Sequence, residues 1–158
     1  MPQLKTKCTI YRGGTSRGLF FLEQDLPEDL SLREKIFLKG IGAEDVSHIN
    51  GLGSGTSHTS KVVIMEKSAD PAVDVNYTFV QLGIGDTTVD YAGTCGNLMA
   101  AVGAFAVDEG FVIADVEASS VLVKVWSTNI QKLIEIEVPL INGAVRTTGR
   151  SEERRVGK

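Results

Sequence analysis

Cysteine, net positive charge and long apolar runs are what this sequence has little of. Two cysteines among 158 residues, Cys8 and Cys95, are too few for a disulfide framework, and we therefore expect a reducing, cytoplasmic environment. The formal net charge of −4 argues against a nucleic-acid-binding surface. No run approaches the roughly 18 apolar residues of a membrane helix, and the N-terminus lacks the apolar block of a signal peptide. The sequence thus predicts neither nucleic acid nor membrane among its partners.

Ligand sets for metals and cofactors are also missing. The two histidines, His48 and His58, have no clustered carboxylate and no ligand spacing, which makes a weak case for a metal site. The glycine-rich stretches lack the Gly-Lys-Ser/Thr run of a nucleotide-binding loop. We therefore expect no metal and no organic cofactor. The rest of the composition suits one globular domain with a substantial core, since 42% of the residues are hydrophobic.

The strongest structural signal lies at residues 89–110. A short strand pattern passes through Gly93-Thr94-Cys95-Gly96-Asn97 into residues 98–107, which are apolar on nearly every side of a helix. A helix without a polar face is buried all round, and small residues in it allow strands to approach closely. We therefore predict a central buried helix wrapped by a sheet, with Cys95 at its N-terminal mouth.

Around this helix the sequence predicts an α+β fold with a strongly bent mixed sheet. Residues 31–39 have the pattern of an amphipathic helix with Ser31 as its N-cap. Alternating or β-rich patterns predict strands at residues 5–12, 17–22, 60–66, 73–84, 88–91, 120–127 and 133–138. Pro139 should end the last of these, and Asn142-Gly143 is the strongest hairpin turn of the chain.

The first stretch that could carry chemistry is Arg12-Gly13-Gly14-Thr15-Ser16-Arg17-Gly18. Successive glycines and hydroxyl residues form loops whose backbone N–H groups can converge on an anion. The two arginines add bidentate donors for carboxylates. The plainer interpretation is a glycine turn flanked by solvated arginines, and this stretch alone does not separate the two.

The second stretch, residues 51–61, is rich in glycine and hydroxyl residues and places Lys61 at the start of an apolar strand. A lysine beside buried surface is partly desolvated, which favours the neutral amine that can act as a general base. The plainer interpretation is a solvated lysine that flanks the strand.

The third stretch is the mouth of the central helix at Cys95. The unpaired N–H groups and partial positive charge of a helix N-terminus stabilise a thiolate and attract carboxylates. Gly93 and Gly96, on either side of the cysteine, are expected to leave its sulfur uncovered. The plainer interpretation is a buried, inert cysteine, as we expect for Cys8 within its strand pattern.

The three stretches together resemble the PrpF-type isomerases, which include methylaconitate isomerases and 4-oxalomesaconate tautomerases and share the diaminopimelate-epimerase-like fold. The resemblance covers residues from about 4 to 149 and lies in Arg12-Gly13-Gly14-Thr15-Ser16, Gly51-Leu52-Gly53 running on to Thr59-Ser60-Lys61-Val62, Val89-Asp90 and Cys95-Gly96-Asn97. It implies a protein of two similar lobes, each a curved sheet around a central helix, with the site in the cleft between them. Residues 1–149 would be the N-terminal lobe, and the second lobe would be absent from this chain.

The resemblance also implies a chemistry and the residues for it. These isomerases shift a proton and a double bond in unsaturated di- and tricarboxylates, without metal or pyridoxal phosphate, so a small anionic carboxylate is the expected substrate. Lys61 matches the proposed catalytic lysine, and Cys95 matches the active-site cysteine. The residues expected to bind the substrate are Arg12, Gly14, Thr15, Ser16, Thr59, Ser60, Gly96 and Asn97. Arg17 and Asn50 replace a usual lysine and a common acidic residue, so the exact polycarboxylate stays open.

Two other functions stay open at this point. An amino-acid epimerase or racemase of the same fold would normally use two facing cysteines, one from each lobe. A non-catalytic accessory protein could bind an anion at the same stretches and assist a partner dehydratase. Lys61 separates this last reading from an enzyme, because arginine could replace it in a pure binder but not in a general base.

The final residues, 150–158 (RSEERRVGK), resemble the translated read-through of a sequencing adapter. We expect them to be a non-native tail; the plainer interpretation is a natural charged tail. A non-native tail would mean that the chain is truncated before its second lobe. The chain alone should then be nearly inactive, and the apolar surface meant for the second lobe should favour aggregation or a homodimer.

Overall fold

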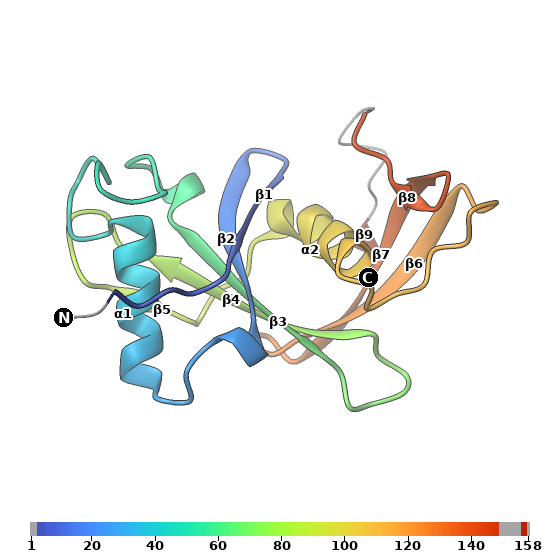
Figure 1. Cartoon of the computed structure of the whole chain (residues 1–158), viewed down its shortest axis with the longest axis horizontal. Helices are drawn as coiled ribbons and strands as arrows, with labels where there is room; N and C mark the ends of the chain where they lie inside the picture. Colours follow the sequence, from blue (N-terminus) through green and yellow to red (C-terminus); the bar gives the residue numbers. More distant parts are fainter. Residues whose placement is uncertain (1–2, 149–155, 158) are drawn as a thin grey trace.

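A strongly curved mixed sheet forms the frame of the molecule (Figure 1). The computed structural model describes residues 3–148 and 156–157. Along the sheet the strands follow the order β1 (Thr9–Gly13), β2 (Ser16–Leu22), β3 (Lys61–Lys67), β4 (Val75–Leu82), β6 (Ser120–Ser127), β7 (Lys132–Ile141) and β8 (Ala144–Val145). The short strand β5 (Val89–Asp90) pairs with β4, and β9 (Val156–Gly157) pairs with β7. Pairs β2–β3 and β4–β6 are parallel, and the other pairs are antiparallel.

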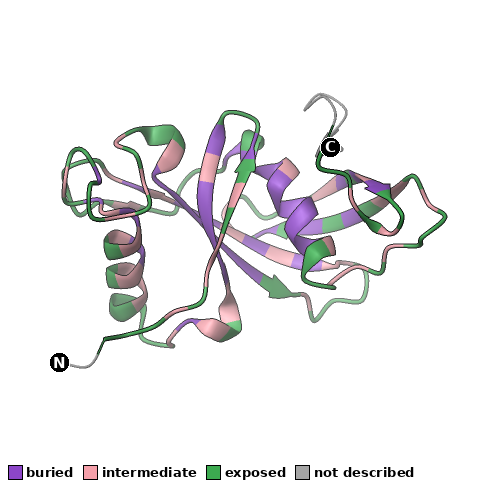
Figure 2. Cartoon of the chain, turned by 45° about the horizontal axis from the view of Figure 1, so that its top comes forward, coloured by how far each residue is buried: buried purple, intermediate pink, exposed green. Residues whose placement is uncertain are grey.

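The sheet wraps around α2 (Gly96–Asp108), as the apolar pattern predicts. This helix contacts both β1 and β8, which lie at opposite ends of the strand order. Figure 2 shows it buried along most of its length, whereas α1 (Leu30–Ile41) exposes one side to solvent. At Gly103 a Cβ atom would lie only 2.7 Å from Cγ2 of Ile136, so glycine is what lets β7 approach the helix so closely. The predicted central buried helix is confirmed, and it begins two residues before the expected start at Leu98.

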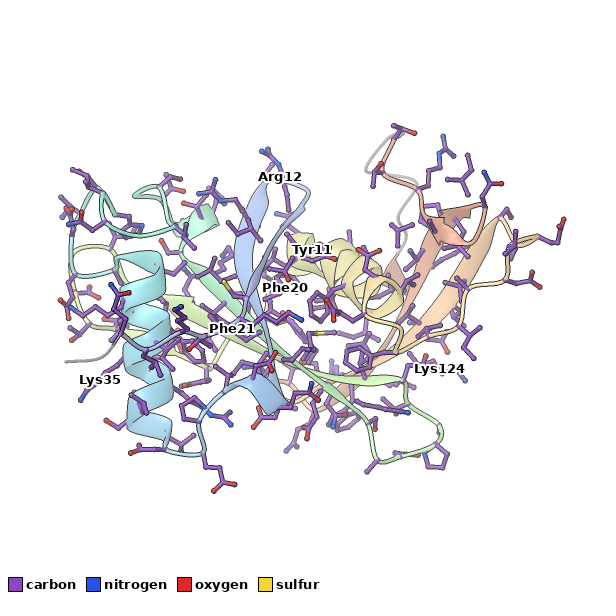
Figure 3. All side chains as sticks on the ribbon, in the orientation of Figure 1. Tyr11, Arg12, Phe20, Phe21, Lys35 and Lys124 are labelled. Carbon is purple, nitrogen blue, oxygen red and sulfur yellow. The ribbon has the colours of Figure 1, made fainter. Side chains whose placement is uncertain are left out.

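Each face of the sheet packs against its own helix because successive side chains of a strand point to opposite faces. On one face Phe20 of β2 packs with Tyr11 and with Phe105 of α2, at ring-centroid distances of 5.1 and 5.4 Å. On the other face the next residue, Phe21, packs with Phe37 of α1 at 5.4 Å. Figure 3 shows the two neighbouring phenylalanines on their separate sides.

The start of α1 differs from the prediction. Asp29 is the N-cap, not Ser31, because the Asp29 carboxylate accepts hydrogen bonds from the backbone N–H groups of Ser31 at 2.9 Å and Leu32 at 3.3 Å. A carboxylate is a stronger partner than a hydroxyl for the positive end of a helix. The helix ends at Ile41, and its C-cap is Gly42, whose φ of 79° is the left-handed conformation that glycine adopts most readily.

Pro139 does not end its strand, because β7 continues to Ile141. The N–H and C=O groups of one strand residue face the same side, and the Pro139 carbonyl accepts from Arg146 N at 2.9 Å on the β8 side. The missing N–H therefore faces away from β6, where Leu140 N still donates to Ser119 O at 2.8 Å. The predicted turn at Asn142 and Gly143 is confirmed, with φ values of 52° and 78°.

The other strands lie close to their predicted positions. The first strand was expected at residues 5–12 but forms as β1 only from Thr9 to Gly13, so half-buried Cys8 precedes it. The chain also forms the short 3-10 helices η1 (Glu23–Asp25) and η2 (Ser57–Thr59). The predicted tail, 150–158, lies outside the described residues except for β9.

Candidate functional site

The glycine turn between β1 and β2 lies directly against the first turn of α2. A Cβ atom at Gly13 would lie 2.2 Å from the Asn97 carbonyl oxygen, and one at Gly14, whose φ is +55°, would lie 2.7 Å from Asn97 Oδ1. Asn97 Nδ2 in turn donates to Thr15 Oγ1 at 3.1 Å. Only residues without a side chain permit this approach. The structure thus joins the first and third predicted stretches into one place.

Cys95 is the N-cap of α2, and its thiol lies beneath this turn. Its Sγ lies 3.6 Å from Oγ of Ser16, and both residues are buried. The expectation that flanking glycines leave the sulfur uncovered is wrong in this structure, because Cys95 is only 9% exposed. Among the described residues, no side chain caps α2 by a hydrogen bond, and nothing lies within 4 Å of a Cβ built on exposed Gly96. The backbone N–H groups at the start of the helix therefore lack a side-chain cap, and Gly96 and Asn97 there are exposed.

Lys61 opens β3 and is buried, not a solvated flanking residue. It is 8% exposed, its Nζ donates to Gln81 Oε1 at 2.7 Å, and the ammonium lies 5.3 Å from the Phe79 ring centroid. Such contacts hold a long, flexible side chain in one place. Among the described residues, the amine contacts a neutral amide acceptor and an aromatic face.

Register places the Lys61 side chain on the same face of the sheet as α2. Lys61 pairs with Gln81 of β4, and two residues further on Val63 pairs with Phe79, which packs in the core around α2. Side chains two residues apart share a face. The other neighbour of β3 is β2, in which Gly18 pairs with Lys61. Gly18 lies two residues after Ser16, whose hydroxyl is next to the Cys95 thiol. The lysine and the cysteine therefore lie on one face, near one end of the sheet.

The remaining predicted residues have more local contacts. Arg12 is exposed at the hairpin, where its Nε donates to Gly14 O at 3.2 Å (Figure 3). The hydroxyl of Thr59 bonds to Thr56 at 2.9 Å, and that of buried Ser60 donates to Thr56 O at 2.5 Å. These two hydroxyls are thus used within the loop before Lys61. The structure does not bring them to the helix mouth by any hydrogen bond among the described residues.

Three residues of the site carry no sequence signal of their own. Gln81 accepts from Lys61 and also donates from Nε2 to Ser60 O at 3.1 Å, and Phe79 forms the surface beneath the amine. Tyr77 is fully buried with its hydroxyl beside Thr94 and Cys95, and burial is the main reason its pKa is raised. Alternation in β4 places all three on one face, but only the tertiary structure shows that this face is the α2 side.

Residues 3–148 contain no group of three or more histidine, cysteine, aspartate or glutamate side chains that could hold a metal ion. His48 is buried in its own loop, where Nδ1 accepts from Gly55 N at 3.0 Å. Within the same part of the chain, neither helix has the length and apolar character that crossing a membrane requires.

Known proteins resemble this chain over nearly its whole length. Residues 3–156 match the family model described as PrpF protein. The chain belongs to the PrpF family. Among curated PrpF relatives, it is 44% identical to 2-methyl-aconitate isomerase of Cupriavidus necator, over 96% of this chain and 40% of the relative. It is 43% identical to 3-methylitaconate isomerase of Eubacterium barkeri, over 93% of this chain and 38% of the relative. This PrpF chain therefore spans about two fifths of the length of these relatives.

Solved structures support the fold expected of a PrpF protein. A crystal structure of methylitaconate-delta-isomerase matches with a TM-score of 0.87 and 42% identity, over 92% of this chain and 64% of that one. A hydroxyproline epimerase from Agrobacterium vitis matches with a TM-score of 0.57 over 87% of this chain and 38% of that one, but at 12% identity. The second match shows the fold alone. The predicted α+β lobe of the diaminopimelate-epimerase-like type is confirmed.

Proposed function

We propose that the protein is a cofactor-independent isomerase or tautomerase that moves a proton and a double bond in an unsaturated di- or tricarboxylate. The observation that carries the proposal is a buried lysine amine on the same sheet face as the N-terminus of α2, where Cys95 is the N-cap residue and no described side chain makes a capping hydrogen bond. The names of the relatives, methylaconitate and methylitaconate isomerases, are those of proteins that act on such carboxylates. A 4-oxalomesaconate tautomerase of Pseudomonas putida, 38% identical over 94% of this chain and 41% of the relative, extends the same class.

The chemistry needs a base and a group that stabilises developing negative charge. In our proposal the neutral amine of Lys61 removes an allylic proton, and the electron pair shifts through the double bond to give a dienolate-like anion. The anion is then protonated at the far carbon of the allyl unit, either by Lys61 or by the Cys95 thiol. Gln81 holds the amine in place through its Oε1, and no cofactor is needed for the atoms and electrons to balance.

The substrate carboxylates are proposed to bind at the helix mouth and the glycine turn beside it. The groups that can donate to them there are the exposed backbone of Gly14 and Gly96, the side chains of Thr15 and Asn97, and Arg12 at the hairpin. An anion at a helix N-terminus is stabilised by unpaired N–H groups and by the helix dipole. Buried Ser16 would act through the Cys95 thiol, and Thr59 and Ser60 through the loop that presents Lys61.

The rest of the protein is part of this proposal. Residues 1–149 would be the N-terminal lobe, a second lobe would close the site, and residues 150–158 would be a non-native tail. The chain's coverage of about two fifths of its relatives supports the first two points. Homodimer formation by the isolated chain and a cytoplasmic location stay predictions. Cys8 and Cys95 are free thiols and form no disulfide with each other.

The test uses the protein restored to the full length of its relatives, with exchange of the substrate's allylic proton for solvent deuterium followed by NMR. Lys61→Met should lower the exchange and isomerisation rates by roughly 10²–10⁴-fold, since it removes a positioned general base while keeping an apolar stem. Cys95→Ser should have a smaller or substrate-dependent effect. Lys67→Met is the matched control, because Lys67 is exposed at the far end of the same strand; it should leave both rates unchanged.

Three outcomes would contradict the assignment. Exchange at the wild-type rate in Lys61→Met, together with loss in Cys95→Ser, would make the cysteine the base. If neither substitution changes exchange, the site lies elsewhere, and an accessory anion-binding role is favoured. If the full-length protein instead inverts an amino-acid stereocentre, it is an epimerase or racemase of the same fold.

A further inference from the structure

Asn129, in the turn between β6 and β7, uses its whole amide group on two distant segments. Its Oδ1 accepts from Phe79 N at 2.7 Å, and its Nδ2 donates to Phe79 O at 2.9 Å. The same Nδ2 donates to Tyr91 O at 2.7 Å. Strand β6 pairs with β4 only as far as Ser127 and Tyr77, so the Asn129 side chain extends that backbone ladder by one more residue.

Both partners of Asn129 lead to the candidate site. Phe79 lies beneath the Lys61 amine, with the nitrogen 5.3 Å from the ring centroid. Tyr91 begins the loop 91–95, which leads to the Cys95 N-cap of α2. The Phe79 ring also borders this loop, since a Cβ at Gly93 would lie 4.0 Å from Phe79 Cε1. One amide group thus fixes the loop that carries the thiol relative to the strand residue that supports the amine.

We propose that Asn129 is a positioning residue, which holds the loop 91–95 against β4 and thereby sets the place of the Cys95 thiol relative to Lys61. The catalytic meaning of this placement rests on the proposed function, but the tether itself does not. The loop needs such a tether because residues 91–94 are solvent-exposed. A loop with exposed backbone opens readily unless specific hydrogen bonds hold it.

A neighbouring residue separates positioning from plain support of the turn. Thr128 precedes Asn129 and also bonds to β4, through its Oγ1 to Thr78 Oγ1 at 2.6 Å and to Tyr77 O at 3.2 Å. Among the described residues, no hydrogen bond joins its side chain to the loop 91–95. Thr128→Val therefore weakens the same turn and keeps the loop tether, which makes it the matched control for changes at Asn129.

The test measures how fast iodoacetamide alkylates Cys95 in the 158-residue chain, in a Cys8→Ser background where Cys95 is the only thiol. Asn129→Ala removes all three amide bonds, of which the Nδ2 bond to Tyr91 O holds the loop, and each net hydrogen bond shifts an opening equilibrium by roughly two- to tenfold. We expect the alkylation rate to rise by about tenfold across the pH profile. Asn129→Asp, which is isosteric, loses the two Nδ2 bonds but keeps an acceptor for Phe79 N; it should behave alike and serves if the alanine variant does not fold. Thr128→Val should stay within about twofold of the parent.

Two results would overturn the proposal. One is an unchanged alkylation rate in both folded Asn129 variants. The other is an equal rise in Thr128→Val, which would mean that any weakening of the turn exposes the thiol. A separate measurement on the full-length protein tests the catalytic meaning: Asn129→Asp should lower kcat with little change in KM. If the full-length parent has no isomerase activity, the proposed function fails while the alkylation result still decides the tether.

Discussion

Gly13→Ala should destabilise the chain because it pushes the β1–β2 hairpin away from α2. Gly13 is buried, and a Cβ there would lie 2.2 Å from the Asn97 carbonyl oxygen and 3.1 Å from Leu98 Cα. Carbon and oxygen in contact lie about 3.3–3.6 Å apart, so the hairpin would have to move by about 1 Å. Both obstructing atoms are helix backbone, and no side-chain rotation can relieve the overlap.

The expected cost combines two terms. Overpacking of a well-packed site costs about 1–3 kcal/mol, and displacement of the turn would break the hydrogen bond between Asn97 and Thr15, worth about 0.5–1.5 kcal/mol at most. We expect a loss of about 2–3 kcal/mol in the free energy of unfolding. For a chain of this length that lowers Tm by roughly 4–12 °C.

The assay is urea unfolding followed by the fluorescence of Trp126, the single tryptophan of the chain. Gly96→Ala is the control at the same site, because its Cβ would meet nothing within 4 Å. Alanine in the first turn of α2 should leave stability unchanged or raise it by up to about 1 kcal/mol. The steric reasoning is refuted if Gly13→Ala stays within about 0.5 kcal/mol of the parent, or if both substitutions cost the same.

Three further predictions concern stability. Burial first, and then the nearby Glu34 carboxylate, raises the pKa of Tyr91 to about 12 from 10.0. The neutral tyrosine therefore contributes stability that is complete below pH 10 and lost toward pH 12. Tyr91→Phe should flatten the fall of the denaturation midpoint over that pH window, and an equally steep fall would contradict this. Arg33→Lys loses the two-pronged contact with Glu23 and should cost about 1 kcal/mol in urea unfolding; a neutral result would mean that the pair is not formed in solution. Phe105→Ala empties a fully packed site around α2 and should cost about 3–5 kcal/mol, and a loss below about 1 kcal/mol would speak against the buried helix.

Much of the fold could be predicted because its signals are local. The all-apolar pattern of residues 98–107 requires a helix buried on every side, and α2 is that helix. Asn142 and Gly143 form a tight hairpin turn because both adopt the positive φ that such turns need. The predicted helix start and strand end were wrong where the same local pattern allows two arrangements. Asp29 capped α1 in place of Ser31, and Pro139 fitted into β7 by turning its missing N–H toward the β8 side.

The candidate site could be predicted as three stretches, but not as one place. Thr15 and Asn97 meet across 82 residues, and Ser16 and Cys95 meet across 79. The hydroxyl of Ser60, a residue expected to bind the substrate, donates within its own loop. Sequence proximity to a candidate base therefore did not decide which side chains surround the helix mouth.

By itself, the sequence determined the elements, the buried helix and the residues capable of acid–base chemistry. Only the tertiary structure decided that Lys61 and Cys95 share a face and that Asn129 ties the loop before the cysteine to β4. The physical reason lies in the range of the forces. Helix periodicity and turn conformation depend on neighbours a few residues apart, whereas strand register depends on burying both faces of the sheet at once. A side chain such as Asn129, polar and in a turn, has no partner that its neighbours in sequence could reveal.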